Sequence, residues 1–306
     1  MMKSIIFLIL AMLLAPIYSA WILKVKAWFG GRKGSPLLIN YYTLIKLFQK
    51  GSVYSTSTTV IFKLGPMISL CAATVALMFL PVAGQPPLLS FKGDVILLLY
   101  LLGLGRFFTI AAAMDTASPF EGMGAAREAY FPIFCEATLF MSLILFYTLT
   151  GNLSLAAFFA GPQTLGLWQA AGPTLLFVAI AFFIVLLTES SRVPVDDPAT
   201  HLELTMIHEV MVLDHSGPDF ALIELGSFFK LFFYSTLVTR LICPFTLGHP
   251  AADACLFFIV LGLVYTAIGV TESVMARYRM DKVPQFVLTS FALAFFATII
   301  TLEFIK

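Results

Sequence analysis

The chain has 306 residues, of which 60% are hydrophobic and 11% are charged, and its formal net charge is +1. Its mean hydropathy is +0.96, which is far above the range of soluble globular domains. This composition excludes an ordinary soluble enzyme and predicts a membrane protein. No glycine-rich nucleotide-binding loop is present, and we expect no nucleic-acid partner.

Long apolar runs predict eight membrane-spanning helices, since one crossing needs roughly 20 apolar residues. The first run resembles a signal peptide, but it is longer than a usual signal core and is followed by a poor cleavage site, so we read it as a span. We therefore expect an all-α, polytopic protein that forms a single membrane domain over residues 1–306. The predicted spans are 4–23, 64–81, 95–114, 130–150, 173–188, 226–242, 254–271 and 285–304.

Between the first two spans, residues 35–49 carry apolar side chains at helical spacing and are followed by Lys50. This segment is short for a span, so we expect an amphipathic helix that lies in the membrane interface. An ordinary connecting segment is the alternative.

Lysine and arginine are distributed unevenly between the two sides of the predicted membrane domain. The loops expected at 24–63, 115–129, 189–225 and 272–284 hold most of them, whereas the opposite side has mainly Lys3, Lys92 and Lys306. The positive-inside rule therefore places these loops in the cytoplasm and both termini outside a cytoplasmic (inner) membrane.

Charged residues inside predicted spans include Lys230 and Arg240, and two others, Arg106 and Glu136, are candidates for a functional role. Arg106 is about eight residues from the cytoplasmic end of the third span, which corresponds to a depth of roughly 12 Å. A guanidinium at that depth needs an anionic partner or a wet cavity, unless the side chain extends back to the interface. Glu136 lies in the fourth span, and without a close cation it would exchange protons near neutral pH. A carboxylate that is only hydrogen-bonded to a neighbouring helix is the alternative.

Residues 115–128 (DTASPFEGMGAARE) mix turn formers and charges with small and apolar residues. A solvated loop is one interpretation of this segment. Its apolar content favours a segment that folds back against the rest of the protein.

The segment 189–230 concentrates charge in a chain that otherwise has little. It holds eight carboxylates and three histidines, His201, His208 and His215. Ionisable groups gathered beside spans indicate charge movement or a docked partner. The histidines recur every seven residues, about 10.5 Å apart along one helix, which is too far for one metal ion. A proton relay, a partner contact and a plain polar helix face remain open for them.

Four cysteines, Cys71, Cys135, Cys243 and Cys255, are scattered in or beside spans, and no CxxC motif occurs. This pattern does not predict an iron–sulfur cluster or a structural zinc site in the chain.

Several separated motifs occur in an order known from one family. They are GRKG at 31–34, YY at 41–42, RFF at 106–108, DTASPF at 115–120, GAARE at 124–128 and RVPVDDPATHLEL at 192–204. On these residues the chain resembles the membrane subunit called 1 or H in NADH–quinone oxidoreductase, complex I. It looks nearer to the counterparts in membrane-bound group 4 nickel–iron hydrogenases, formate hydrogenlyase subunit 4 and hydrogenase-4 component C.

The resemblance implies a heel subunit that joins a cytoplasmic redox arm to antiporter-like membrane subunits. Such a subunit is not itself catalytic and couples electron transfer to proton or sodium translocation. It implies as partners the hydrogenase-type large and small soluble subunits, an iron–sulfur subunit and the lipid bilayer. The iron–sulfur clusters and the nickel–iron centre are expected in those partners, with no cofactor in this chain.

The resemblance and the charge pattern together give two sets of candidate residues. Arg127 and Glu136 match a family arginine and the intramembrane glutamate nine positions later. For ion translocation and coupling the candidates are Arg106, Arg127, Glu136, Asp196, Glu203, Glu209, Asp214 and Glu224. For the interface with the arm they are Arg32, Lys46, Asp115, Arg192, Asp197 and His201.

The chain also departs from the complex I pattern. Ala199 and His201 stand where further glutamates are usual, the span-entry glutamate falls near Ser227, and Gly51 replaces an acid. These departures favour the hydrogenase branch. The alternative is the quinone-binding membrane subunit of an NADH–quinone oxidoreductase. A free-standing transporter and a pure anchor are further possibilities, although no internal repeat of the transporter kind is visible.

Overall fold

The computed structural model describes residues 2–159, 161–197, 206–244 and 249–304. Over these residues the chain is all-α, with no strand. The helices are α1 (Met2–Phe29), α2 (Ile39–Phe48), α3 (Val60–Met78), α4 (Asp94–Asp115), α5 (Pro119–Tyr130), α6 (Pro132–Thr150), α7 (Leu155–Phe158), α8 (Gly161–Glu189), the 3₁₀ turn η1 (Glu209–Val212), α9 (Gly217–Ile242), α10 (Pro250–Val274) and α11 (Val283–Phe304).

Eight stretches of helix within the described residues are long and apolar enough to cross a membrane. They are α1, α3, α4, α5 together with α6, the greater part of α8, α9, α10 and α11. Each coincides with one of the predicted spans. The predicted fold class is thereby confirmed, and the chain is a multi-pass membrane protein.

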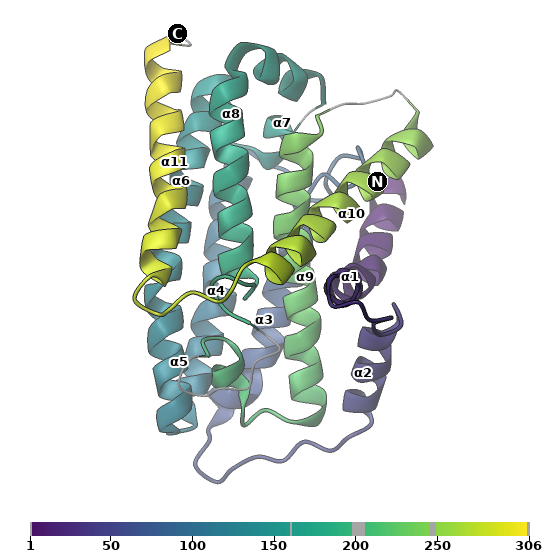
Figure 1. Cartoon of the computed structure of the whole chain (residues 1–306), viewed down its shortest axis with the longest axis vertical. Coiled ribbons are helices and arrows are strands. Elements are labelled where there is room, and N and C mark those ends of the chain that lie inside the picture. The colour runs from purple at the N-terminus through teal and green to yellow at the C-terminus, as the bar shows by residue number, and fades with distance from the viewer. Residues whose placement is uncertain (1, 160, 198–205, 245–248, 305–306) are drawn as a thin grey trace.

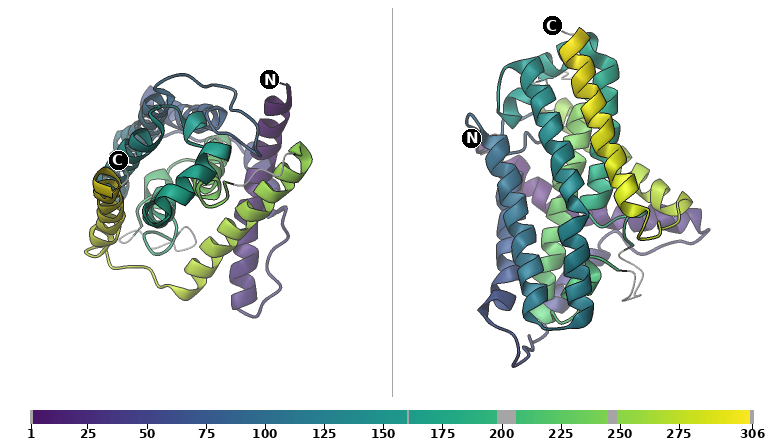
Figure 2. Two further views of the ribbon diagram at one scale, coloured as in Figure 1. Left: turned by 90° about the horizontal axis from the view of Figure 1, so that it is seen from above. Right: turned by 90° about the vertical axis from the view of Figure 1, so that its left-hand side faces the viewer.

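Helices α8 and α9 form the interior of the bundle. Seen from above, they are surrounded by α3, α4, α6 and α11 on one side and by α1 and α10 on the other (Figure 2). Nearly every side chain of α9 between Phe228 and Leu241 is buried. Helices α1 and α10 cross the bundle at a steep tilt and pack against each other (Figure 1). The core of the protein therefore follows α9, which contacts helices from both sides.

Several helices continue beyond the apolar runs that predicted them. Helix α1 reaches Phe29, and α9 begins at Gly217 with Pro218 in its first turn. Proline is well accommodated there because its missing N–H would have no partner within the helix. Residues 189–225, predicted as a loop, thus include the turn η1 and the start of α9.

Helix α5 occupies most of the predicted loop 115–129. Pro119 starts it, and Glu121 in its first turn is buried. A side chain at Gly124 would come within 2.9 Å of the Ile207 carbonyl oxygen and still nearer to Val210. The absence of a side chain at Gly124 therefore lets α5 lie directly on residues 207–211. The expectation that this segment folds back against the protein is correct, but it does so as a helix.

The amphipathic segment after α1 forms α2. Asn40 donates a hydrogen bond to the Pro16 carbonyl oxygen at 2.9 Å, and the Tyr41 hydroxyl donates to that of Leu13, so α2 is fixed to α1. Leu44 is buried, while Tyr42, Ile45 and Phe48 are exposed. A helix therefore forms in the predicted segment and exposes apolar side chains, and its position in the membrane interface stays a prediction.

Candidate functional site

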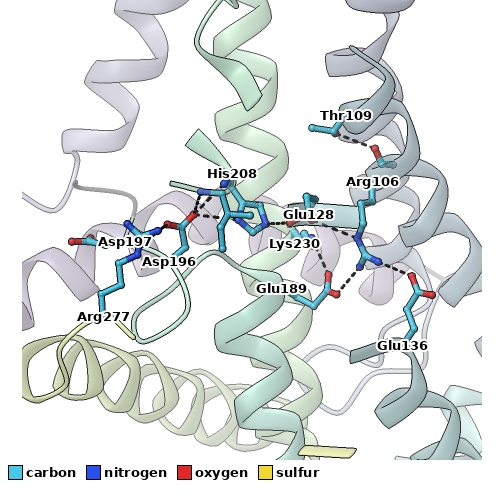
Figure 3. Close-up of polar contacts among 12 residues, drawn as sticks. Arg106, Thr109, Glu128, Glu136, Glu189, Asp196, Asp197, His208, Lys230 and Arg277 are labelled. Atoms are coloured by element: carbon cyan, nitrogen blue, oxygen red, sulfur yellow. Dashed lines mark hydrogen bonds and ion pairs between the residues drawn. The ribbon is translucent and has the colours of Figure 1, made fainter. Parts of the chain in front are cut away.

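The side chain of Arg106 is the centre of a cluster of charges inside the bundle. It extends from α4 and is 12% exposed. Its Nη1 lies 2.6 Å from Oε1 of Glu136, its Nη2 lies 2.5 Å from Oε1 of Glu189, and its Nε lies 3.5 Å from Oε1 of Glu128. Three carboxylates from α5, α6 and α8 therefore share one guanidinium (Figure 3). The sequence-based requirement for an anionic partner is met.

The helices around Arg106 are staggered. Arg106 lies well inside α4, whereas Glu189 is the last residue of α8. Close packing at this level comes from Gly105, where an added Cβ would lie 3.2 Å from that of Ala72 in α3. The second oxygen of Glu189 lies 3.0 Å from Nζ of Lys230 in α9. Arg106 of α4, Glu189 of α8 and Lys230 of α9 are therefore in contact at the same height in the bundle.

His208 extends this cluster toward the loops. Its Nε2 lies 3.0 Å from Oε2 of Glu128, and its Nδ1 lies 3.5 Å from Oδ2 of Asp196. The same Asp196 oxygen accepts hydrogen bonds from the backbone N–H groups of Ile207 and His208. Nη2 of Arg277 lies 2.9 Å from the other oxygen of Asp196. An unbroken series of ionic contacts therefore runs from Arg277, between α10 and α11, to Glu136 on α6. We call these residues the ionic network: Arg277, Asp196, His208, Glu128, Arg106, Glu136, Glu189 and Lys230.

Two of the network members that lie on loops, Asp196 and His208, are charged at neutral pH. Burial lowers the pKa of His208, but the charge of Glu128 and hydrogen bonds to Asp196 and Glu128 outweigh it and raise the pKa to about 9. Burial raises the pKa of Asp196, but hydrogen bonding and charge from His208, with the charge of Arg277, leave it below its usual value. His208 is therefore a cation that joins two carboxylates.

A cavity of about 360 Å³ opens beside the network. Serine hydroxyls and apolar side chains contribute to its wall, together with charged groups of both signs. The charged residues and His208 that line it are Lys26, Arg106, Arg192, His208, Lys230, Glu128, Glu189, Glu209 and Glu224. This space is large enough and polar enough to hold several water molecules in contact with the network.

A second ionic cluster lies at the Lys26 and Arg192 side of this cavity. The buried carboxylate of Glu272 in α10 lies 2.9 Å from Nζ of Lys26 and 3.3 Å from Nη1 of Arg192. Arg192 also donates to the Ser19 hydroxyl at 3.3 Å. These contacts tie the tilted helices α1 and α10 to the segment after α8.

His215 has a different role from His208. Its ring stacks on Phe62, with 3.9 Å between ring centroids and 5° between planes. Burial lowers its pKa to about 4, although Asp219 and Asp214 act in the opposite direction. His215 is therefore neutral and packs the start of α3 against the start of α9. His201 lies outside the described residues.

The structure brings together only part of the predicted coupling set. Arg106, Glu136 and Asp196 belong to the ionic network, while Glu209 and Glu224 line the cavity. Two other predicted residues, Arg127 and Asp214, lie elsewhere. Arg127 donates to the Met206 carbonyl oxygen at 2.7 Å, Asp214 is exposed with its N–H bonded to Glu121, and Glu203 lies outside the described residues.

The predicted arm-interface residues are also divided. Arg32 and Lys46 are exposed, as an interface requires. Asp115 accepts hydrogen bonds from the backbone N–H and hydroxyl of Thr59, and so joins the end of α4 to the start of α3. The guanidinium of Arg192 is mostly buried in its ion pair with Glu272, and Asp197 lies next to Asp196 and is partly buried.

Five members of the network were absent from the predicted site: Glu128, Glu189, His208, Lys230 and Arg277. One signal could have found Lys230, because a charged residue within a span is a functional candidate by default. Glu189 likewise ends an apolar span. Within the described residues, no group of three or more His, Cys, Asp and Glu side chains is placed to hold a metal ion.

Comparison with known proteins identifies the family. Residues 2–302 match the family model described as NADH dehydrogenase. Hydrogenase-4 component C of Escherichia coli is 26% identical over 94% of this chain and 91% of its own length. Formate hydrogenlyase subunit 4 of the same organism is 27% identical over 92% of both chains.

The NADH-quinone oxidoreductase subunit named H, from Rickettsia prowazekii, is 25% identical over 77% of this chain and 70% of its own length. A chain in the structure of the membrane-bound sulfane sulfur reductase, an archaeal respiratory membrane complex, has the same fold, with a TM-score of 0.80, 21% identity and 98% coverage of both chains. The resemblance inferred from the motifs is confirmed, and the chain belongs to the NADH dehydrogenase family of membrane subunits.

Proposed function

We propose that this chain is the membrane heel subunit of an energy-converting complex of the hydrogenase or formate hydrogenlyase type. In this role it anchors a cytoplasmic redox arm and couples electron transfer to proton or sodium translocation. Its relatives include subunits of hydrogenase-4 and formate hydrogenlyase, matched over more than nine-tenths of the chain. We further propose a cytoplasmic-membrane location with both termini outside, supported by the basic loops.

The observation that carries the coupling proposal is the continuity of the ionic network. Near one end, Asp196 and His208 lie on the segment between α8 and α9, and at the other end Glu136 lies within a span. A moved unit charge about 4 Å from a carboxylate changes its energy by roughly 1–4 kcal/mol, depending on the local dielectric. Movement of His208 away from Glu128 would therefore alter the electrostatic potential at Arg106 and at the carboxylates it holds.

In this mechanism the arm acts on the network through the segment after α8. Contacts of the arm with this segment would change the distance between His208 and Glu128 as the redox state changes. Waters in the cavity of about 360 Å³ would carry protons to and from the carboxylates that line it. The chain itself holds no redox centre in this proposal, and the iron–sulfur clusters and nickel–iron centre belong to its partners.

The decisive experiment separates ion movement from electron transfer. The intact complex is purified with Glu136→Gln and reconstituted into vesicles, and the number of ions moved per electron is measured. A fall of at least fivefold, with little change in electron transfer, is the expected result. Glu303→Gln, at an exposed position near the end of α11, is the control and should keep the wild-type ratio. A wild-type ratio in Glu136→Gln would refute the relay role.

The quinone-binding membrane subunit of an NADH–quinone oxidoreductase is the second candidate. It is favoured by the relatives from NADH-quinone oxidoreductases and by the volume of the cavity beside Arg106. Purified complex that reduces a soluble quinone, with NADH as donor and no hydrogenase activity, would establish this alternative. Co-purification of hydrogenase-type large and small subunits would instead support the first proposal.

A further inference from the structure

A groove on the outer face of the bundle runs between α4 and α6 and has a volume of about 310 Å³. Its walls include Tyr100 and Phe107 of α4 and Phe140 of α6, and Gly103 and Glu136 also line it. The groove extends over residues 99–107 of α4, which is about 12 Å, or two helical turns.

The surface around this groove is apolar, as expected for a face turned to lipid or to another membrane protein. Tyr100 is 70% exposed and Phe107 63% exposed, and Ile133 and Ile144 of α6 are also exposed. An added Cβ at Gly103 would meet no atom within 4 Å, so the groove is open at that point.

Glu136 is a charged residue on this otherwise apolar surface. Arg106 binds it from the inner side, yet 48% of the Glu136 side chain remains exposed toward the groove. In Figure 3, Glu136 lies at the end of the ionic network, beyond Arg106. Hydrocarbon chains offer no hydrogen-bond donor, so a half-exposed carboxylate is unfavourable against lipid. The face therefore requires a covering that is apolar and carries at least one donor.

We propose that a transmembrane helix of a second membrane subunit occupies this groove, with a small residue against Gly103 and a hydrogen-bond donor or cation facing Glu136. Glycine at the groove favours close approach of a second backbone, as is common where helices pair in membranes. The two-turn length fits one helix. The proposal rests on the proposed function only in requiring that the chain works in a complex with other membrane subunits.

A photo-crosslinker in place of Tyr100 tests the occupant directly. In the complete complex in native membranes, p-benzoylphenylalanine at Tyr100 should join the chain to an apolar span of another subunit. The same probe at Leu263 of α10, which is 63% exposed, should not give that product. Products with lipid alone, or with a second copy of this chain, would overturn the proposal. So would the same product in equal yield from Leu263.

Filling the groove gives an independent test. Gly103→Leu adds a side chain into open space and should leave the chain folded in the membrane, while reducing the crosslinked partner at least tenfold. Gly166→Leu in α8 is the matched control, because an added Cβ there also meets no atom within 4 Å. Undiminished crosslinking and co-purification in Gly103→Leu would refute the interface. A wild-type ion-to-electron ratio in Glu136→Gln, with the Tyr100 crosslink retained, would count against the coupling proposal alone.

Discussion

His208 makes the stability of this protein depend on pH in a way that can be calculated. Its pKa is about 9 in the folded protein, against about 6.5 when it is exposed to water. A raised pKa means that the folded state binds the proton more tightly. The stabilisation is therefore complete below about pH 6.5 and is lost as the pH rises through about 9.

The size of the effect follows from the same two values. The difference between these two pKa values corresponds to about 3 kcal/mol at pH 6, about 2 kcal/mol at pH 7.5 and almost nothing at pH 10. The His208 side chain is 22% exposed, so these figures are upper estimates. His208→Gln removes this titration, and its difference in stability from the wild-type protein should shrink as the pH rises.

The assay is unfolding of the detergent-solubilised protein at pH values between 6 and 10, for wild type and His208→Gln. Lost hydrogen bonds give the variant a constant offset, whereas lost titration gives a slope, so only the slope tests the argument. The exposed His249, beside the start of α10, provides the control His249→Gln, which should follow the wild-type curve. A constant difference between wild type and His208→Gln across this range would refute the assignment of His208 as the charged link.

Substitutions at Arg106, Gly124 and Asp115 test the packing and charge of the site by thermal unfolding in detergent. Arg106→Met leaves buried carboxylates without their guanidinium and should destabilise the fold by about 3–5 kcal/mol; Arg106→Lys should recover part of this, because it restores the charge but not the forked geometry. Gly124→Val should lower the free energy of unfolding by about 1–3 kcal/mol, because α5 has no space for a side chain there. Gly122→Ala is the control, since its position has open space, and it should lower the free energy of unfolding by at most about 0.5 kcal/mol. Asp115→Ala removes the acceptor for Thr59 and should cost about 1 kcal/mol.

The spans were predictable because the membrane imposes one simple requirement on length and polarity. The requirement for an anion at Arg106 could also be predicted, because an unpaired charge inside the membrane is unfavourable. The condition attached to Glu136, that no cation lies close, is not met, because Arg106 lies 2.6 Å away. These two residues are 30 positions apart and lie on different helices, so no local sequence pattern indicates their contact.

The choice between adjacent residues could not be made from the sequence either. Arg127 and Glu128 are neighbours on α5 and point about 100° apart around the helix. Only the packing of α5 on residues 207–211 turns Glu128 toward Arg106 and leaves Arg127 on the Met206 carbonyl. Likewise, the regular spacing of His208 and His215 suggested one helix face, whereas one histidine belongs to an ionic contact and the other to an aromatic stack.

The balance of the ionic network explains why it could transmit a disturbance. With His208 protonated, four cations face four carboxylates, so any loss of one charge leaves an opposite charge uncompensated inside the protein. Uncompensated buried charge is strongly unfavourable, and the smallest correction is the gain or loss of one proton elsewhere in the network. Glu136 is the member best placed for that exchange, because its side chain is 48% exposed whereas those of Glu128 and Glu189 are at most 4% exposed. A displacement at Asp196 and His208 would then cause Glu136 to gain or lose a proton at the groove between α4 and α6, where the proposed partner helix lies.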